Sequence, residues 1–413
     1  MKIVLAIDSF KGCLTSEEVE QAVAQCLSAK FANSLIDSIP IADGGEGTLS
    51  ALMQHTQATY QTVEVHNPCM KKIRASYGIS SDGRKAFIEM ANASGLTLIS
   101  ESERNPMKTT TFGTGELIAD ALDKGCTEFI IGIGGSATND AGTGMLQALG
   151  YRFMDKGGKT LGVGGEILSK ISFIDESAKH PLLKNAHFIV ACDVRNPFYG
   201  PQGAAHIFAP QKGANGTMVD ELDYGLQQLA QAILRHTGKD ISSIPGSGAA
   251  GGMGGGMLAF LPSVLKSGSD ILLELCNFDD RIEGAILNIT GEGKMDKQTL
   301  MGKIPYHILQ AGIKKGIPVI ALTGKAEDKE ELINAGFKAI YTITPDSMPL
   351  AEAMKPEVAQ KNIQRLLESA TPADLESLIR LGHIHKTSTS IRDMLRQFIL
   401  DTGCRLGIFC HHI

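Results

Sequence analysis

The chain of 413 residues contains no tryptophan, and aromatic residues make up only 5% of it. Surfaces that stack bases or sugar rings depend on large aromatic side chains, so the composition argues against both kinds of binder. The formal net charge is −6, whereas a general binder of nucleic acid or of anionic membranes is basic. We therefore expect no nucleic-acid partner, and any positive charge that meets an anionic ligand must be local.

Long apolar runs and paired cysteines are also missing. No run approaches the ~18 residues of a membrane span, and the apolar N-terminal run is interrupted by Asp8, too early for a signal peptide. The eight cysteines are scattered without a CxxC pair, which is typical of free thiols in a reducing compartment. We expect a cytoplasmic protein that does not associate with a membrane.

Apolar runs rich in β-branched residues alternate with helical patterns along most of the chain. This alternation predicts an α/β fold with a largely parallel sheet. The expected strands are residues 2–7, 129–133, 186–192, 285–289, 318–322 and 338–343, and the clearest expected helices are 217–236, 305–315 and 357–369.

The segment from residue 60 to 90 has a different pattern. Three strand-like runs follow one another there without a helix between them, which predicts antiparallel strands. We therefore expect one domain built from both ends of the chain, residues 1–65 plus 285–370, interrupted by an inserted α/β domain at 66–284.

Four glycine-rich loops share one character: each combines glycines with acidic or basic residues, and three of them directly follow an expected strand. They are DSFKG (8–12), ADGGEGT (42–48), GIGGSATND (132–140) and TGEGKMD (290–296). In open α/β sheets, ligands bind beyond the carboxyl ends of the strands, and glycines let backbone N–H groups approach phosphate oxygens. A tight turn alone can explain one such loop, but four together favour a phosphate site.

A fifth glycine-rich stretch, PGSGAAGGMGGGM (245–257), leaves three interpretations open: a flexible linker, close backbone packing or a ligand loop.

Two nucleotide-binding signatures were tested against the glycine pattern. Gly132, Gly134 and Ala137 satisfy a relaxed G-x-G-x-x-A dinucleotide pattern, with Asp155 near the spacing of a ribose-binding acid. Glycines at 142 and 144 fall where that pattern needs a helix, which weighs against a dehydrogenase. A Walker loop at GKT (158–160) would need glycine where Phe153 stands, so that match fails.

Charged residues in these loops suit phosphoryl transfer, which needs a carboxylate for a metal and cations for the phosphates. Candidate magnesium ligands are Asp43, Glu46, Glu292 and Asp296, each of which could instead cap a helix. Candidate cations are Lys11, Lys212, Lys294 and Lys303, each of which could simply be solvated.

The stretch ACDVRNPFYGPQGA (191–204) places Asp193 after an expected strand and Arg195 two residues further on. The two could form a structural ion pair, or serve as a base beside a carboxylate clamp, for which the planar fork of arginine is suited. The histidines have no metal-ligand spacing, Cys410, His411 and His412 form an isolated terminal run, and no G-x-S-x-G elbow is present.

Taken in order, these motifs resemble those of the bacterial type-1 glycerate kinases. The resemblance rests on DSFKGCLTSEEV, PIADGGEGT, EMANASGL, NPMKTTTFGTGELI, GIGGSATNDAGTGMLQALG, ACDVRNPFYGPQGAAHIFAPQKGA, GAAGG and NITGEGKMDKQTLMGKIP, which run from residue 8 to about 306. Weaker similarity continues to about residue 369.

The resemblance implies ATP-dependent phosphorylation of D-glycerate with Mg²⁺. It implies 2-phosphoglycerate as the product and leaves 3-phosphoglycerate open. It also implies a flavodoxin-like (Rossmann-like) parallel-sheet domain interrupted by a second, inserted α/β domain, with the active site in the cleft between them.

The resemblance assigns Asp193 as the base, with Arg195 and Lys11 as clamps for the substrate carboxylate or phosphate. It gives the magnesium to Asp43, Glu46 or Asp296. Residues expected to bind substrate or ATP are Asp8, Ser9, Gly12, Gly44, Gly45, Gly134, Gly135, Ser136, Thr138, Asn139, Asp140, Lys212, Glu292, Gly293 and Lys303.

The chain departs from the family pattern in a few places. Cys13 stands where serine is usual, Ala141 stands where glycine is common, and the tail at 371–413 has no recognised counterpart. The sequence leaves a homodimer open. It also leaves two competing functions: a nicotinamide-dependent dehydrogenase of a small hydroxy acid, and a non-catalytic sensor of a sugar acid or nucleotide.

Overall fold

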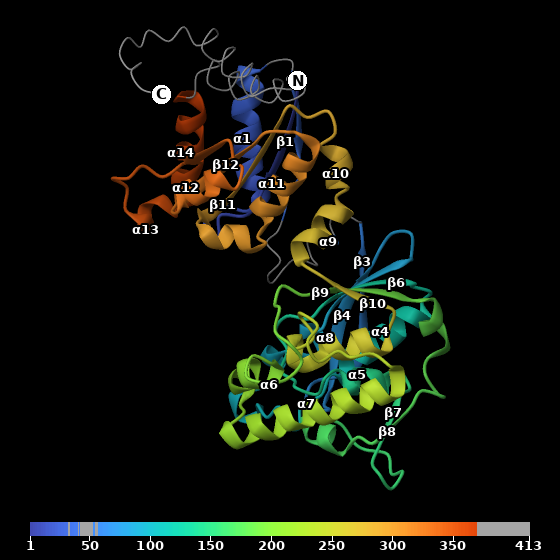
Figure 1. Ribbon diagram of the computed structural model, residues 1–413. Helices are drawn as coiled ribbons and strands as arrows, with labels where there is room; N and C mark the ends of the chain where they lie inside the picture. The colour runs from blue at the N-terminus through green and yellow to red at the C-terminus, as the bar shows by residue number, and fades with distance from the viewer. Residues whose placement is uncertain (32–33, 40, 42–52, 54–56, 370–413) are drawn as a thin grey trace, which may run out of the picture. The chain divides into compact units, whose positions relative to one another are not determined.

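The computed structural model describes residues 1–31, 34–39, 41, 53 and 57–369 (Figure 1). The chain divides into two compact units, which we describe separately. Unit 1 comprises Met1–Ala42 and Asn277–Ile413, and unit 2 comprises Asp43–Cys276. No helix in the described ranges is long and apolar enough to cross a membrane.

The boundaries between the units lie earlier than the 65 and 285 that we expected from sequence. Strand β3 (Thr59–His66) pairs along its whole length with β4 (Lys72–Ile79), antiparallel, inside unit 2. Its cross-strand partners, rather than its distance from the N-terminus, therefore decide to which unit it belongs.

Unit 1 is built on a five-stranded sheet in which every neighbouring pair is parallel. Its strands are β1 (Lys2–Ile7), β2 (Leu35–Ser38), β11 (Leu287–Met295), β12 (Val319–Ala326) and β13 (Ala339–Thr342). The spatial order is β2-β1-β11-β12-β13, which is 2-1-3-4-5 when the strands are numbered within the unit. The direction of winding therefore reverses between β1 and β11.

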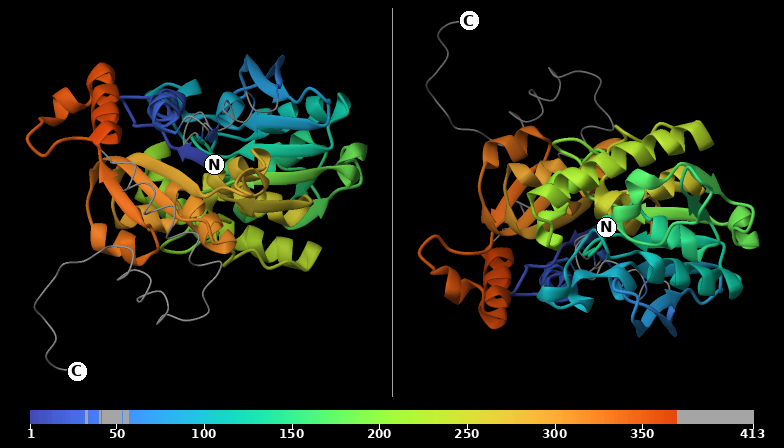
Figure 2. Two further views of the ribbon diagram at one scale, coloured as in Figure 1. Left: turned by 90° about the horizontal axis from the view of Figure 1, so that it is seen from above. Right: turned by 90° about the horizontal axis from the view of Figure 1, so that it is seen from below.

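Helices cover this sheet, and the sequence places their apolar residues accordingly (Figures 1 and 2). The helices are α1 (Ser16–Lys30), α10 (Phe278–Arg281), α11 (Ile304–Lys315), α12 (Lys329–Asn334), α13 (Leu350–Ala353) and α14 (Pro356–Ser369). A capping box between Thr15 and Glu18 starts α1. The stripe Val19, Val23 and Leu27 is buried with residues of α14 against β1 and β11.

Unit 2 contains a six-stranded mixed sheet in the order β10-β9-β6-β5-β4-β3. The remaining strands are β5 (Lys85–Glu89), β6 (Glu128–Gly132), β9 (His187–Ala191) and β10 (Ser263–Lys266). Strands β10, β9, β6 and β5 are parallel, whereas β4 is antiparallel to both of its neighbours. The antiparallel structure expected for residues 60–90 is confirmed.

The helices of unit 2 from residue 57 onward are α3 (Ala91–Ser94), α4 (Phe112–Asp123), α5 (Thr143–Ala148), α6 (Ala204–Phe208), α7 (Gly216–Thr237), α8 (Ala249–Phe260) and α9 (Gly268–Leu275). A separate antiparallel pair, β7 (Arg152–Met154) and β8 (Phe173–Asp175), lies outside the main sheet. Apolar residues of both the helices and the six strands form one large core.

The glycine-rich stretch 245–257 forms the approach to α8 and most of the helix itself, so it is not a flexible linker. A Cβ atom on Gly256 would lie 2.1 Å from the Ala141 carbonyl oxygen, and one on Gly251 would lie 2.2 Å from that of Thr138. No real Cβ fits at such distances. The glycines are therefore needed for close backbone packing, one of the three interpretations that the sequence left open.

Candidate functional site

In unit 1, the loop after β1 lies directly beside the end of β11. Lys11 is in an exposed turn closed by the Phe10–Leu14 bridge, and Gly12 has a left-handed φ of 72°. A Cβ on Gly293 would lie 3.4 Å from Phe10 Cα and 3.5 Å from the Lys11 nitrogen. Two glycine-rich loops that are 280 residues apart in sequence therefore meet where the winding of the sheet reverses, the usual ligand position in such folds.

The buried Asp8 starts this first loop, and its Oδ1 accepts a hydrogen bond from the Ser9 N–H at 2.6 Å. The carboxylate therefore helps to fix the first peptide after the strand, close to Lys11.

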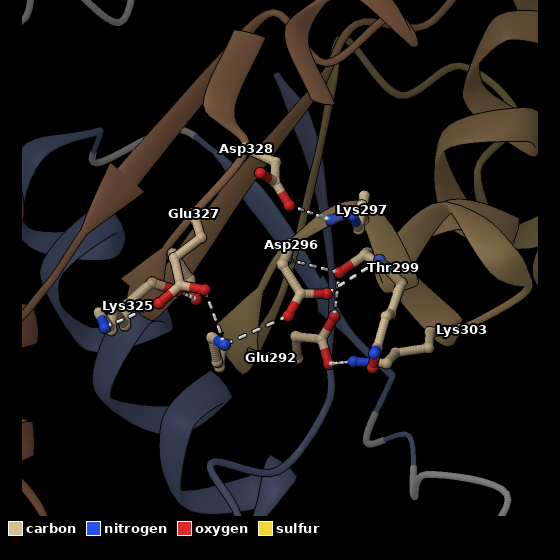
Figure 3. A network of polar contacts seen from close by, with 11 residues as sticks. Glu292, Asp296, Lys297, Thr299, Lys303, Lys325, Glu327 and Asp328 are labelled. Atoms are coloured by element: carbon tan, nitrogen blue, oxygen red, sulfur yellow. Dashed lines mark hydrogen bonds and ion pairs between the residues drawn. The ribbon is translucent and has the colours of Figure 1, made fainter. Parts of the chain in front are cut away.

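Glu292 holds the centre of a polar network at the end of β11 (Figure 3). Its Oε1 accepts a hydrogen bond from Thr299 Oγ1 at 2.6 Å, and its Oε2 pairs with Lys303 Nζ at 2.8 Å. The Glu292 side chain is only 10% exposed. Since an ammonium group has three donors, Lys303 can bind a phosphate oxygen while it keeps its contact with Glu292.

Asp296 caps the 3₁₀ turn Lys297–Met301, where its Oδ1 accepts a hydrogen bond from the Gln298 N–H at 2.9 Å. Its Oδ2 lies 3.3 Å from Lys294 Nζ. Burial alone would raise the pKa of Asp296, but the Gln298 amide and Lys294 outweigh it and hold that pKa below its usual value. The capping interpretation is confirmed for Asp296, and its carboxylate is ionised.

An outer part of the network joins the ends of β11 and β12. Glu327 accepts Lys294 and Lys325, each at 2.8 Å, and these two contacts lower the pKa of Glu327 to about 2. The charges are open to solvent, where ion pairs contribute little to stability and can be rearranged easily.

The expected magnesium site was compared with the donors that are present. Within the described ranges, no group of three or more His, Cys, Asp or Glu side chains is arranged to hold a metal ion. The Glu292 carboxylate contacts Thr299 and Lys303, and the Asp296 carboxylate contacts the Gln298 amide and, at 3.3 Å, Lys294. Because Mg²⁺ is often held by one or two carboxylates plus substrate phosphates, Asp296 stays a proposed ligand.

In unit 2, the loop after β6 exposes two glycines and buries the polar side chains that follow. Gly134 and Gly135 are exposed, and Gly135 has a left-handed φ of 69°. The Gly135 carbonyl accepts the Leu96 N–H at 2.9 Å, and the Ala137 N–H donates to the Ser94 carbonyl at 2.9 Å. The backbone at the two glycines is therefore fixed and open to a ligand.

Lys212 lies beneath this loop and is only 1% exposed. Its Nζ donates to Ser136 Oγ at 2.7 Å and to the Thr138 carbonyl oxygen at 2.6 Å. Burial lowers the pKa of Lys212 to about 7, while the nearby Asp140 acts in the opposite direction. In this structure Lys212 supports the loop from inside, and its expected contact with substrate or ATP stays a prediction.

Asp140 is fully buried and binds the starts of two helices. It accepts hydrogen bonds from Thr111, through the backbone N–H at 2.8 Å and the hydroxyl at 2.9 Å, and from the N–H groups of Gly142 and Gly144. Burial raises its pKa, against the effect of these hydrogen bonds. The neighbouring Thr138 and Asn139 are also fully buried, and the Thr138 hydroxyl and the Asn139 amide have no hydrogen-bond partner among the described residues. A direct contact of these residues with ATP stays a prediction.

Asp193 is exposed just after β9, and its Oδ1 accepts a hydrogen bond from the Gly268 N–H at 2.9 Å. Gly268 begins α9, whose N-terminus favours a negative charge. Arg195 is exposed and forms no ion pair with Asp193 or any other described residue, so the structural ion pair that the sequence left open is absent from the described part of the chain.

Several expected site residues lie outside the described residues: Asp43, Gly44, Gly45 and Glu46, as does the tail at 371–413.

Two buried polar residues of α1, Ser16 and Glu20, were not among the functional residues predicted from the sequence. Their signal was visible in the pattern, because they lie on the same helical face as the apolar stripe of α1 yet are polar.

The interpretation of Gly132, Gly134 and Ala137 as a dinucleotide-binding turn fails, because Asp155 does not lie where a ribose-binding acid would. Its Oδ1 accepts the Gly157 and Lys159 N–H groups at 2.8 and 3.0 Å and so shapes the turn that follows β7. The strand before it belongs to the separate β7–β8 pair, whereas a ribose-binding acid follows a strand of the nucleotide-binding sheet.

Each unit has parallel strands that end in glycine loops, with Lys11 and Lys303 in unit 1 and the exposed Asp193 in unit 2, and such groups suit a kinase of small molecules. A protein-family model described as the glycerate kinase family matches residues 3–373. The chain belongs to this family and is a kinase, which overturns both the dehydrogenase and the sensor alternatives.

Similar proteins agree with this placement. The chain is 44% identical to a glycerate 2-kinase of Escherichia coli K12 over 356 residues, which cover 86% of this chain and 93% of the relative. It is 42% identical to a glycerate kinase of Bacillus subtilis 168 over 383 residues, or 92% and 98% of the two chains. A crystal structure assigned to a glycerate kinase 2 of Salmonella typhimurium LT2 matches with a TM-score of 0.76 and 39% identity, over 94% of this chain and 98% of that one.

Proposed function

We propose that this kinase transfers the γ-phosphoryl group of ATP to D-glycerate and forms 2-phosphoglycerate. The observation that carries the proposal is Asp193, an exposed carboxylate at the carboxyl end of β9 with its Oδ1 on the first amide of α9. The relatives named glycerate kinase or glycerate 2-kinase support the acceptor and the 2-position of transfer.

The fold supports the rest of the proposal. The strand order 2-1-3-4-5 of unit 1 is that of flavodoxin-like sheets, and unit 2 is inserted between β2 and β11. As part of the proposal, unit 1 is a flavodoxin-like domain interrupted by unit 2.

In the proposed reaction, Asp193 accepts the proton of the attacking glycerate hydroxyl. The hydroxyl oxygen bonds to the γ-phosphorus while the bond from that phosphorus to the bridging oxygen breaks, and ADP leaves with the electron pair. Arg195 suits the substrate carboxylate because its planar fork can donate two parallel hydrogen bonds. The amides at Gly134 and Gly135, together with Lys11 and Lys303, would stabilise the phosphate charge.

Magnesium would add charge neutralisation at the phosphates. Asp296 is the described residue proposed to hold it, with Asp43 and Glu46 as further candidates from the sequence. A homodimer stays a prediction.

Replacing Asp193 with asparagine tests the base. The amide oxygen of Asp193→Asn can still accept the Gly268 N–H, so the fold and ATP binding should persist, whereas proton acceptance is lost. We expect kcat to fall by about 10²–10⁴-fold, measured as ADP release with D-glycerate. Asp240→Asn is the matched control, because Asp240 is exposed and also accepts a backbone N–H, that of Ser242 at 2.9 Å. Wild-type turnover in Asp193→Asn would remove Asp193 as the base.

Product analysis tests the substrate and the position of transfer. ADP release should require D-glycerate and Mg²⁺, with little release for L-glycerate, and phosphorus NMR should show the 2-phosphate. A 3-phosphate product would overturn the proposed position, and release that is independent of the acceptor would overturn the proposed substrate.

A further inference from the structure

Two polar side chains lie on the buried face of α1, where the helix packs against the sheet of unit 1. Ser16 is 8% exposed and Glu20 is 1% exposed. They are four residues apart and therefore occupy the same face of the helix. A buried polar group is costly unless it is hydrogen-bonded, so the contacts of these two side chains call for an explanation.

The Ser16 hydroxyl connects two backbone segments. It donates to the carbonyl oxygen of Ile7, the last residue of β1, and accepts the N–H of Ile41 at 2.9 Å. Strand β2 ends at Ser38, and among the residues that the structure describes its pairing with β1 continues to the contact of the Ile39 N–H with the Leu5 carbonyl. The Ser16 side chain thus replaces the strand pairing that is missing at the end of β1.

Glu20 provides a second contact of this kind, because it binds the N–H of Ile7 whereas Ser16 binds the Ile7 carbonyl oxygen. Its Oε1 accepts the Ile7 N–H at 2.9 Å, while its Oε2 is buried without a hydrogen-bond partner among the described residues. Burial raises the pKa of Glu20 to about 8. The Ile7 amide and Arg281 act against that shift, and Asp37 and Glu17 add to it, with Arg281 and Asp37 themselves paired. The carboxyl is therefore neutral at pH 7.

We propose that Ser16 and Glu20 are positioning residues that fix both peptide groups of Ile7 and thereby hold the loop Asp8–Gly12 in place for phosphoryl transfer. The step from this geometry to catalysis rests on the proposed function, in which Lys11 contacts a substrate. The next residue after Ile7 is Asp8, whose carboxylate binds the following amide. The chain that carries Lys11 thus starts from a point fixed by α1.

Two substitutions at Glu20 distinguish the loss of its hydrogen bond with the Ile7 N–H from a change in side-chain packing. Glu20→Gln keeps an oxygen for the Ile7 N–H and resembles the neutral acid, so its kinetics at pH 7 should stay within about twofold of wild type. Glu20→Met fills similar space without an acceptor. We expect it to raise KM for D-glycerate or ATP at least tenfold and to speed hydrogen exchange of amides 7–12. Unchanged KM and exchange in Glu20→Met would overturn the proposal, and a lower melting temperature alone would count against it in the same way.

Ser16 gives a second, independent pair in case Glu20→Met does not fold. Ser16→Ala removes both contacts of the hydroxyl, whereas Ser16→Thr keeps a hydroxyl there. We expect faster exchange at amides 7–12 and a higher KM in Ser16→Ala, with most of the effect rescued in Ser16→Thr. Equal behaviour of the two variants would contradict the role of the hydroxyl. Hydrogen exchange needs no substrate, so it measures the order of the loop Asp8–Gly12 even if the wild-type enzyme fails to phosphorylate D-glycerate.

The pH dependence of stability tests the neutral state of Glu20. Since the folded-state pKa of about 8 lies above the ordinary value of 4.5, the folded chain binds more protons between these limits. Stability is therefore lost as the pH rises from about 4.5 to about 8. We expect the melting temperature of wild type to fall relative to Glu20→Gln over this range. If the melting temperatures of wild type and Glu20→Gln changed with pH in the same way, Glu20 would be ionised in the folded chain. That result would overturn this part of the inference.

Discussion

The two units both place charged residues beside glycine loops, but they differ in where the charges lie. In unit 2, Lys212 and Asp140 are buried, and their hydrogen bonds go mostly to the backbone of the loop and of the helix starts. In unit 1, Lys294, Glu327 and Lys303 reach solvent at the ends of β11 and β12. These two buried charges of unit 2 therefore set the shape of a loop, whereas these three solvent-accessible charges of unit 1 can rearrange around a ligand.

The difference matters for interpreting motifs. A charged residue in a glycine-rich motif is easily assigned to the ligand, as the sequence assigned Asp140 and Lys212 here. In the structure both residues are buried and bind groups of the protein itself, Lys212 the Thr138 carbonyl oxygen and Asp140 the Thr111 N–H, and a direct contact of either with ATP or substrate stays a prediction. Substitutions of these charges should therefore cost stability in unit 2 and cost little stability in unit 1.

The largest expected effect is at Asp140. Asp140→Ala would leave several buried donors at the starts of α4 and α5 without an acceptor, and breaking a buried network of this kind costs about 3–5 kcal/mol. Urea unfolding of the full chain measures the loss. Asp155→Ala is the matched control, because Asp155 also accepts two backbone N–H groups but in a turn at the surface. A loss no larger than that of the control would remove the contrast between buried and exposed charge.

A smaller effect of the opposite sign is expected at Ala141. This residue has a φ of 53° and is buried, and a left-handed conformation costs a residue with a Cβ roughly 1–2 kcal/mol. Ala141→Gly should stabilise unit 2 by about 0.5–1 kcal/mol, after the larger unfolded-state entropy of glycine is subtracted. Ala148→Gly, inside α5, should instead destabilise the fold. Destabilisation by both substitutions would show that residue 141 is not strained.

The smallest effect is expected in the exposed part of the unit 1 network. Glu327→Gln removes the acceptor of Lys294 and Lys325, but solvent replaces it there. We expect no measurable change in melting temperature and less than a twofold change in kcat. A clear loss of stability would mean that the surface charges of unit 1 are structural too, and the comparison between the units would fail.

Much of the fold followed from the sequence. The β-branched runs predicted β1, β6 and β9 almost to the residue, and apolar periodicity did the same for α7 and α11. The unit boundary near β3 did not follow, because the antiparallel pattern of residues 60–90 predicts the pairing of β3 with β4 but does not state which sheet the pair joins. Likewise, the exposure of Asp193 agreed with its position after a strand, but the burial of Asp140 depends on how α4 and α5 pack, which no local pattern states.

The glycine face of α8 has a mechanical consequence. No layer of side chains separates this helix from residues 138–142, and the Ala141 N–H donates to the Gly251 carbonyl at 3.0 Å. Backbone lies directly on backbone there, at the kink of α8 where residues 250–252 have left-handed φ and ψ angles, so the contact restrains residues 138–142. A ligand that meets the preceding glycines would find them already ordered, and little conformational entropy would remain to be lost on binding.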